Sequence, residues 1–553
     1  MKMGDVNNDK QVVEVQWSQQ PSDEEIMENM LKVRYEHAKT LKKDYSHLFR
    51  TKSRLELIRL SVYQIGVEFC YAAETAFVSP ILLGNGLQYT FMTMVWAFAP
   101  TLGFLCAPLV ASFSDQLRSS WGRRRPVLLA LGLAVVVGLL ILPHGKQIGI
   151  LLGDDDVPVD LMSDFRWGVL ITVIGLVLTD FDIETSSGVG RTYFMDVCVA
   201  ADHARVLTTA MIIGGVGGAA GYTLGAIDWQ QTDVGSLLGS NEATVFAGVV
   251  IVVGIALFVT LTSFREAPLP LMEQDPLLKP VTPKMFEAEK SRQLAVCSIA
   301  GMVEAPKKID HVPVTVDDED EEKPLAFLDF FKNLRRMPRS LAILYLTQFL
   351  AQAGYMSYCL YFTDFVGSTV FGGDVAALEG SPELKLYDQG VRFGCWGMAL
   401  FAISTAIYSL IIERVIEYFS ARFVLVGGLL VFSVGMLLMG IINTKWMVIV
   451  CGLTVGIMYA TIYSVPFLLI SQYHARNSFA MKDGKLVESD QRRGFGADVS
   501  MLSSMLFLAQ LIISLAIGSV IDALETSAVI VYSASIFSFL AAISATQILY
   551  LDG

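Results

Sequence analysis

Hydrophobic runs of about twenty residues, separated by short polar loops, occupy most of the chain from Leu57 onward. An α-helix of that length crosses the hydrocarbon core of a lipid bilayer. The pattern therefore predicts twelve membrane-spanning helices. We expect these spans near residues 57–83, 91–113, 126–144, 167–199, 206–226, 243–263, 341–364, 391–412, 421–442, 446–470, 497–520 and 527–549.

Charged residues in the short loops predict how the spans are oriented. The loop between the second and third spans holds Arg123, Arg124 and Arg125, and such basic loops remain on the cytoplasmic side. Loops on the opposite side are poorer in Lys and Arg, and one of them contains the acidic run Asp154–Asp156. Both termini are therefore predicted to be cytoplasmic. We call the cytoplasmic end of the helices the inner end and the opposite end the outer end.

A polar stretch rich in proline at residues 265–340 divides the spans into two sets of six. No apolar periodicity continues through it, so we predict a largely disordered cytoplasmic linker. The chain would then consist of a cytoplasmic tail (1–56), a six-helix bundle (57–264), the linker (265–340) and a second six-helix bundle (341–553). This all-α layout resembles that of the major facilitator transporters, whose substrate site lies between the two halves.

Composition supports a membrane protein and excludes other classes. Of the 553 residues, 53% are hydrophobic and 17% are charged, whereas a soluble domain carries about a quarter charged residues. The net charge of −13 argues against nucleic-acid binding. The seven cysteines form no CxxC pair or Cys/His cluster, so neither a metal site nor a bound cofactor is expected. No catalytic constellation typical of a soluble enzyme occurs, and we expect no enzymatic activity.

Ionisable residues inside the predicted spans are candidate functional groups, because a charge at membrane depth is costly. The fourth span contains Asp180, Glu184 and Arg191. At 3.6 residues per turn, Asp180 and Glu184 share a helix face, and Arg191 returns to within about 20° of it. Asp182 points elsewhere. We predict either a relay in which the two carboxylates take up protons and Arg191 binds substrate, or a structural salt bridge to a neighbouring helix.

Two further spans of the first half extend this set. Glu68 and Glu74 in the first span are also candidates for proton coupling, but they lie about 240° apart on a helix, so at most one should face a central cavity. In the fifth span Gly217, Gly221 and Gly225 recur at a spacing of four, which permits close helix contact. We expect that stripe to contact the fourth span.

Amide and hydroxyl side chains lie beside aromatic rings in the seventh and tenth spans. Such surfaces suit sugars, which present hydroxyl groups around apolar C–H patches. Anchoring at the membrane interface and packing between helices are the alternatives. The candidate substrate-binding residues of the second half are Gln348, Gln352, Tyr355, Tyr358 and Tyr459.

Two inner loops carry candidate gating charges. One loop holds Asp115 together with the arginines at 123–125, and the corresponding loop of the second half holds Glu413 and Arg414. Charge pairs between the loops could stabilise an outward-open state. A role in membrane topology alone is the alternative.

Several whole segments resemble the animal proton-coupled sugar transporters, which are related to the plant sucrose/proton symporters. The similar segments are Glu68–Glu74, Ser79–Leu83, Trp121–Pro126, Gly190–Cys198, Gly221–Trp229 and Arg493–Asp498. The resemblance implies uptake of sucrose or a related sugar with protons, and it assigns functional roles to Asp180 and Arg191. The chain departs from that family where Glu184–Val189 replaces the Gly-Pro pair that usually precedes the arginine. An organellar carrier of another solute and a non-transporting sensor remain alternatives.

The linker contains one short motif that resembles a sorting signal. Glu273-Gln274-Asp275-Pro276-Leu277-Leu278 matches the acidic dileucine pattern that endosomal sorting adaptors read, although linker composition alone can produce it. We expect the plasma membrane as the site of residence, with an endolysosomal membrane as the alternative.

Overall fold

The computed structural model describes residues 22–154, 166–279, 281, 283–299, 338–378, 380–475, 478–482, 485–488 and 495–550. The chain divides into two compact units. The larger unit, Lys52–Leu269 with Glu322–Gly553, contains the predicted spans. The smaller unit combines the N-terminal tail with part of the linker, Met1–Thr51 with Pro270–Glu321.

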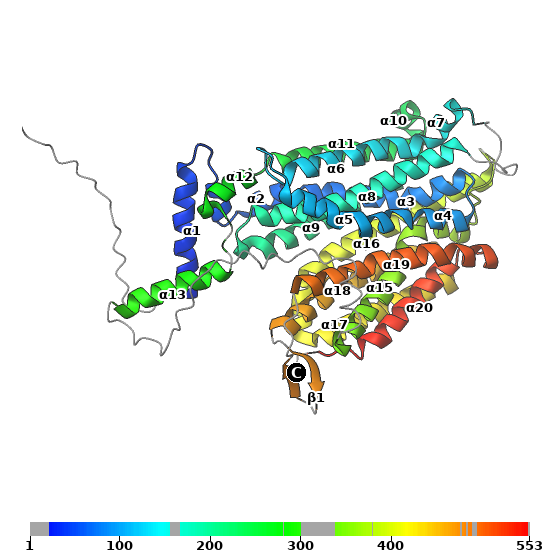
Figure 1. The fold of residues 1–553 in the computed structure, drawn as a ribbon. Coiled ribbons are helices and arrows are strands. Elements are labelled where there is room, and N and C mark those ends of the chain that lie inside the picture. The colour runs from blue at the N-terminus through cyan, green and yellow to red at the C-terminus, as the bar shows by residue number, and fades with distance from the viewer. Residues whose placement is uncertain are drawn as a thin grey trace, which may run out of the picture. The chain divides into compact units, whose positions relative to one another are not determined.

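The first half of the larger unit is a helical bundle (Figure 1). Its helices are α2 (Arg54–Ser61), α3 (Tyr63–Gly84), α4 (Tyr89–Val95), α5 (Phe98–Gln116), α6 (Arg125–Ile141), α7 (Gly145–Leu151), α8 (Trp167–Asp196), α9 (Ala200–Ala226), α10 (Asp233–Leu238) and α11 (Asn241–Leu261). Close packing joins α3 to α9 and α6 to α8.

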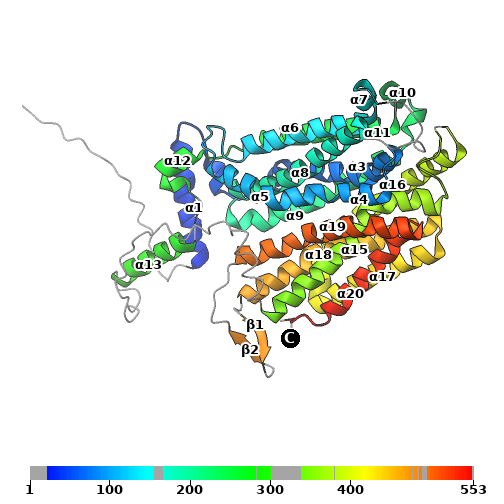
Figure 2. The ribbon, with the colours of Figure 1, turned by 45° about the vertical axis from the view of Figure 1, so that its right-hand side comes forward.

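The second half forms another helical bundle, which Figure 2 shows beside the first. Its elements are α15 (Arg339–Phe365), α16 (Pro382–Phe419), α17 (Ala421–Ile442), α18 (Lys445–Ala475), α19 (Phe495–Leu524) and α20 (Val529–Ala545). A hairpin of β1 (Ser478–Lys482) and β2 (Lys485–Glu488), antiparallel to one another, lies in the loop before α19, where we had predicted no strands. The halves meet where α9 packs on α16, α4 and α5 on α19, and α3 on α15.

Helices stand at all twelve predicted spans. Within the described residues, eight helices are long and apolar enough to cross a membrane. The other four spans correspond to α4 with α5, to α8, to α15 and to the shorter α20. Large apolar side chains such as Val137, Ile251 and Phe258 are exposed on the surface of the bundle. Such surfaces are stable in lipid, which explains why these helices are apolar on nearly every face.

The glycine stripe of α9 contacts α3, so our assignment of it to the fourth span was wrong. A Cβ atom on Gly221 would lie 2.7 Å from the Cβ of Ala72, and one on Gly217 would lie 2.7 Å from a backbone oxygen of α3. On another face of α9, a Cβ on Gly215 would lie 3.0 Å from Ala406 of α16, in the second half. The fifth span therefore joins the first span to the second half of the protein.

The described part of the linker is helical, whereas we predict a largely disordered segment. It contains helices α12 (Leu269–Gln274) and α13 (Pro283–Ile299) and the 3₁₀ turn η5 (Pro276–Leu278). Both η5 and α13 pack on α1 (Asp23–Thr40), which a capping box of Ser22 and Glu25 starts; the 3₁₀ turn η1 (Ser46–Phe49) follows α1. A search for periodicity inside the linker could not detect order that depends on a distant helix. Residues 300–337, including the acidic run, lie outside the described residues.

The contact between α9 and α3 can be tested by adding volume to it. We expect Gly221→Val to lower thermal stability and the folded yield in detergent, because overpacking a close helix contact costs about 1–3 kcal/mol. Gly254→Val on α11 is the matched control, since a Cβ at Gly254 meets no atom within 4 Å. Fluorescence-detected size exclusion after a heat series measures both, and equal stability of the two variants would contradict this packing.

Candidate functional site

Carboxyl groups from α3 and α8 form a cluster inside the first half. Asp180 and Glu184 lie one turn apart on α8, and the electrostatic field of both reaches Glu74 on α3. The hydroxyl of Tyr71, also on α3, donates a hydrogen bond to Glu184 Oε2. Asp180 and Glu184 remain partly exposed, whereas Glu74 is 1% exposed and its Oε1 has no hydrogen-bond partner in the structure.

Glu68 reaches the same cluster from the inner side. Its Oε1 accepts a hydrogen bond of 3.0 Å from Gln64 Nε2, and it interacts electrostatically with both Glu184 and Arg191. Since Glu184 lies within range of Glu68 and Glu74 alike, both first-span carboxylates belong to one electrostatic group. We expected at most one of the two to face a cavity. The two differ in exposure, since Glu68 is partly exposed and Glu74 is buried, but both lie within electrostatic range of Glu184.

Arg191 is exposed and makes no direct salt bridge with the acids of its own helix. Its Nη2 donates to Ser187 Oγ at 3.2 Å. Seven residues of helix place Arg191 about 10 Å along the axis from Glu184, beyond the reach of a contact pair. Its charge acts instead on Glu68 and on Tyr459 and Tyr463 of α18, in the second half. The polar face of α8 therefore carries two carboxylates and, nearer the inner end of the helix, a guanidinium. The charge of this guanidinium acts on residues of the second half.

Aromatic rings of the second half lie within electrostatic range of this guanidinium. The rings of Tyr459 and Tyr463 lie 4.6 Å apart between centroids, and Tyr355 of α15 lies 5.0 Å from Tyr459. Tyr459 and Tyr463 are partly exposed. Gln352, one turn before Tyr355, is 1% exposed. The structure thus gathers Tyr355 and Tyr459 from our predicted set, and it adds Tyr463.

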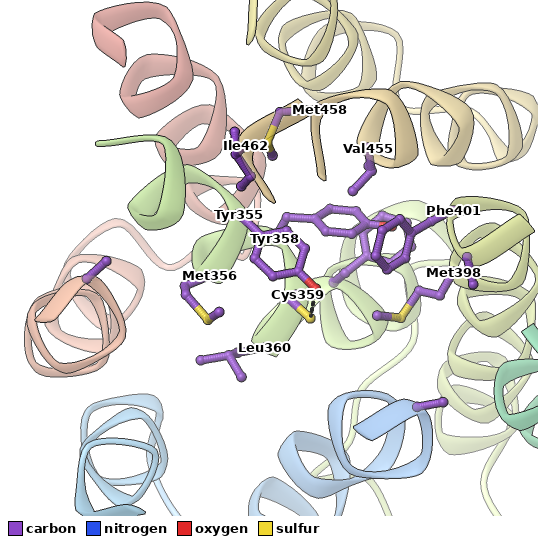
Figure 3. Close-up of a cluster of buried hydrophobic side chains, with 14 of the residues drawn as sticks. Tyr355, Met356, Tyr358, Cys359, Leu360, Met398, Phe401, Val455, Met458 and Ile462 are labelled. Carbon is purple, nitrogen blue, oxygen red and sulfur yellow. Dashed lines mark hydrogen bonds between the residues drawn. The ribbon is translucent and has the colours of Figure 1, made fainter. Parts of the chain in front are cut away.

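Two predicted substrate-binding residues lie in the packing core. Tyr358 is fully buried, and its ring contacts Phe401 and Phe432 edge to face, as part of the cluster in Figure 3. Gln348 is 3% exposed and donates through Nε2 to the carbonyl oxygen of Ile462 at 3.2 Å. Both side chains point between α15 and its neighbours, because their positions on that helix face the interior of the second half. Gln348 thus packs between helices, as its alternative describes, and Tyr358 lies in the same core.

The inner-loop arginines pair with acids of their own half. Arg123 binds Asp196 at 2.9 Å, and Arg124 binds both Asp196, at 3.2 Å, and Asp115. The guanidinium of Arg125 donates to the carbonyl of Leu261. No pair between these arginines and the loop holding Glu413 and Arg414 occurs among the described side chains, which include an exposed Arg414 but not the side chain of Glu413.

Glu266 fastens that arginine loop to the end of α11. Its carboxylate accepts hydrogen bonds from the backbone N–H groups of Arg124, at 2.9 Å, and of Arg125. Burial and the neighbouring Asp196 raise the pKa of Glu266, and the backbone N–H groups oppose that rise. Gly122 has φ +115°, and any Cβ there would lie 2.3 Å from the Glu266 carboxylate. Only glycine fits this turn, which explains its place before the three arginines.

A second polar group joins the halves at the outer end. Asp364 of α15 is fully buried and accepts hydrogen bonds from Tyr89 of the first half, at 2.9 Å, and from Tyr387 of α16, at 2.8 Å. Asp522 of α19 accepts from the backbone N–H of Thr90 at 3.0 Å. Further cross-half bonds run from Ser79 to the Leu360 carbonyl, from Thr363 to the Ala76 carbonyl and from Arg392 to Asp228.

Sequence reasoning missed most residues of these networks, and four of them show why. Asp364 is an acid in an apolar span and could have been found by the rule that was applied to Asp180. Asp196 ends α8 and Glu266 lies in the loop after α11, where acids are common, and only the folded chain shows that both meet the arginine loop. The tyrosine at 89 follows a loop and carries no distinguishing pattern.

Comparison with solved structures shows the fold. The D-xylose-proton symporter covers 90% of this chain and 98% of its own length, with a TM-score of 0.54 and 13% sequence identity. The nucleoside transporter NupG gives a TM-score of 0.53 at 11% identity. At this identity the likeness concerns the fold alone, and that fold is the major facilitator fold of two six-helix halves.

Comparison with curated sequences shows the family, although no family model matches. The human membrane-associated transporter protein is 32% identical over 494 residues, which is 87% of this chain and 90% of that protein. Human proton-associated sugar transporter A is 26% identical over 90% of this chain and 86% of that protein. Human solute carrier family 45 member 4 is 25% identical over 87% of this chain and 85% of that protein. The chain belongs to solute carrier family 45.

The outer network can be tested by removing one hydroxyl at a time. We expect Tyr89→Phe to increase labelling of Leu360→Cys by a membrane-impermeant thiol reagent about tenfold, because a hydrogen bond to a charged group contributes about 1.5–3 kcal/mol. Tyr387→Phe is the matched control, since it removes a bond to the same carboxylate from within the second half. Similar labelling in both variants would show that the cross-half bond does not hold the outer end closed.

Proposed function

We propose that this protein is a proton-coupled sugar transporter that works by alternating access. The observation that carries the proposal is the joint cluster of Glu74, Asp180 and Glu184 on one side and Arg191 with Tyr459 on the other. A protein that did not move protons and solute would have little reason to keep several carboxylates at membrane depth. The name of proton-associated sugar transporter A, a relative over most of the chain, points the same way.

The carboxylate cluster provides a place for the coupling proton. Neighbouring carboxylates in a site of low polarity cannot all remain charged without cost, so such a cluster can hold a proton. Asp180 and Glu184 are partly exposed and can exchange protons with water, whereas Glu74 is enclosed behind them. We assign Asp180 and Glu184 to proton uptake, with Glu74 and Glu68 setting the electrostatic field around them.

Sugar binding is assigned to the region between Arg191 and the tyrosines of the second half. The guanidinium presents a planar fork of donors that suits vicinal hydroxyl groups. The rings of Tyr355, Tyr459 and Tyr463 add an aromatic surface for the C–H face of a sugar ring. Because Arg191 comes from the first half and the tyrosines from the second, sugar bound there would contact both halves. That geometry is what alternating access requires.

The network at the outer end defines the proposed conformational state. The cross-half hydrogen bonds and ion pairs described above lie toward the outer ends of the helices, including those of Asp364 and Asp522. Given the predicted orientation, this is an inward-facing state. The arginines at 123–125 then pair within their own half, and pairs of these arginines with Glu413, or of Asp115 with Arg414, would form only when the inner ends close. We propose the plasma membrane as the site of residence, with an endolysosomal membrane as the second choice.

Replacing Asp180 tests proton coupling. We expect Asp180→Asn to abolish sugar accumulation driven by a pH gradient while sugar exchange continues, because an amide cannot carry the proton. Reconstituted vesicles with a panel of radiolabelled sugars, with and without the gradient, measure both activities. Asp233→Asn on the exposed start of α10 is the control. Wild-type accumulation in Asp180→Asn would remove this residue from the coupling mechanism.

Replacing Arg191 tests sugar binding. Arg191→Lys keeps the positive charge and loses the planar fork, so we expect the apparent KM for sugar to rise about tenfold or more with normal expression. Arg422→Lys, at an exposed arginine that bonds only a backbone carbonyl in the structure, is the matched control. An unchanged KM in Arg191→Lys would reassign the arginine to a structural role.

A further inference from the structure

The acidic dileucine motif at Glu273–Leu278 is folded against the N-terminal helix. Leu278 is 2% exposed, whereas its neighbour Leu277 is 38% exposed. The motif is not extended at its leucines, because Pro276–Leu278 forms the 3₁₀ turn η5 and Asp275 caps this turn by accepting from the Leu277 N–H at 3.1 Å. A partner that binds two leucine side chains in pockets needs both exposed. In this conformation it could reach only one of them.

Contacts from α1 hold the motif in this folded form. His37 Nε2 lies 2.6 Å from Asp275 Oδ2, so the residue that caps the turn also binds α1. The buried guanidinium of Arg34 donates to the carbonyl of Lys279, directly after the motif. These two α1 residues therefore bracket the two leucines from both sides. Neither contact involves the transport site, since both lie in the smaller unit.

A third contact lies farther along the same helix pair. Lys290 of α13 binds Asp23 at the start of α1, at 2.7 Å. The Nη2 atom of Arg34 also lies 3.6 Å from Met285 Sδ of α13. The motif's turn η5 is thus folded together with α1 and α13, and α1 lies more than two hundred residues from the other two in the sequence. Releasing α1 would expose Leu278 without unfolding any membrane span.

We propose that α1 is a built-in cover for a sorting signal, and that an adaptor which reads one acidic side chain and two leucines competes with α1 for Leu278. With α1 in place the signal is off, and the protein stays at the membrane where it resides. Displacement of α1 lets the segment after Glu273 extend and present both leucines. This function concerns the number of transporters at the membrane and does not depend on the solute carried.

Removing the two bracketing side chains tests the proposal in the full-length protein. We expect Arg34→Ala/His37→Ala to raise hydrogen–deuterium exchange of residues 273–280 about fivefold or more, because local opening becomes easier. The same variant should lower the fraction of the protein at the cell surface about twofold or more in a biotinylation assay. The reason is that the opened motif becomes available to the adaptor. Lys32→Ala/Lys39→Ala is the matched control, since it removes two basic residues from the exposed face of the same helix.

A third substitution separates signalling from folding. Leu277→Ala removes an exposed leucine of the motif and leaves the buried Leu278 in place, so adding it to Arg34→Ala/His37→Ala should restore the wild-type surface fraction. Unchanged exchange in the double variant would show that α1 is not the cover. Increased exchange with an unchanged surface fraction, or a loss that Leu277→Ala does not reverse, would show that the motif is no sorting signal. Either result overturns the proposal.

Discussion

Asp364, buried between the two halves with a tyrosine hydroxyl on each side, illustrates the constraint on which this structure depends. A carboxylate taken out of water is stable only if hydrogen-bond donors or opposite charges replace the water. Here the donors come from both halves, from Tyr89 and Tyr387, so satisfying the acid also closes the outer end. The same requirement draws Asp196 and Glu266 to the arginine loop at the inner end. Helices that lipid could hold in many arrangements are fixed by a few polar groups.

The proposed transport site is subject to the same constraint, and its carboxylates meet that constraint only in part. Glu74 is buried with an oxygen that has no hydrogen-bond partner, and the acids of α8 are not neutralised by a contact with Arg191. Such groups are costly when charged and become less so on binding a proton. A site of this kind links protonation to the arrangement of the helices around it. The hydrogen-bonded networks at either end hold the fold, and we propose that the carboxylate cluster between them responds to protons and solute.

The close contacts of α9 connect that cluster to the second half. Gly221 and Gly217 press on α3, which carries Glu68 and Glu74, and Gly215 faces α16 on the opposite side. Movement of one half against the other would therefore shift or strain α3, the helix that carries two of the carboxylates. Packing this tight tolerates rigid-body sliding but not local deformation. The glycine stripe thus lies against the helix that carries Glu68 and Glu74, although this neighbour is not the one we expected.

Sequence alone determined the twelve spans, the division into halves and the ionisable residues at membrane depth, because hydrophobic length and the cost of burying charge are local properties. It also placed Asp180, Glu184 and Arg191 on one face, since helix geometry relates residues a few turns apart. Only the tertiary structure decided that Tyr358 and Gln348 are core residues while Tyr459 stands near Arg191. It alone showed that the arginine loop pairs with Asp196 and Glu266, and that α1 folds over the dileucine motif. These pairings join residues far apart in the chain. The local sequence pattern around a residue does not indicate which distant residue it will contact.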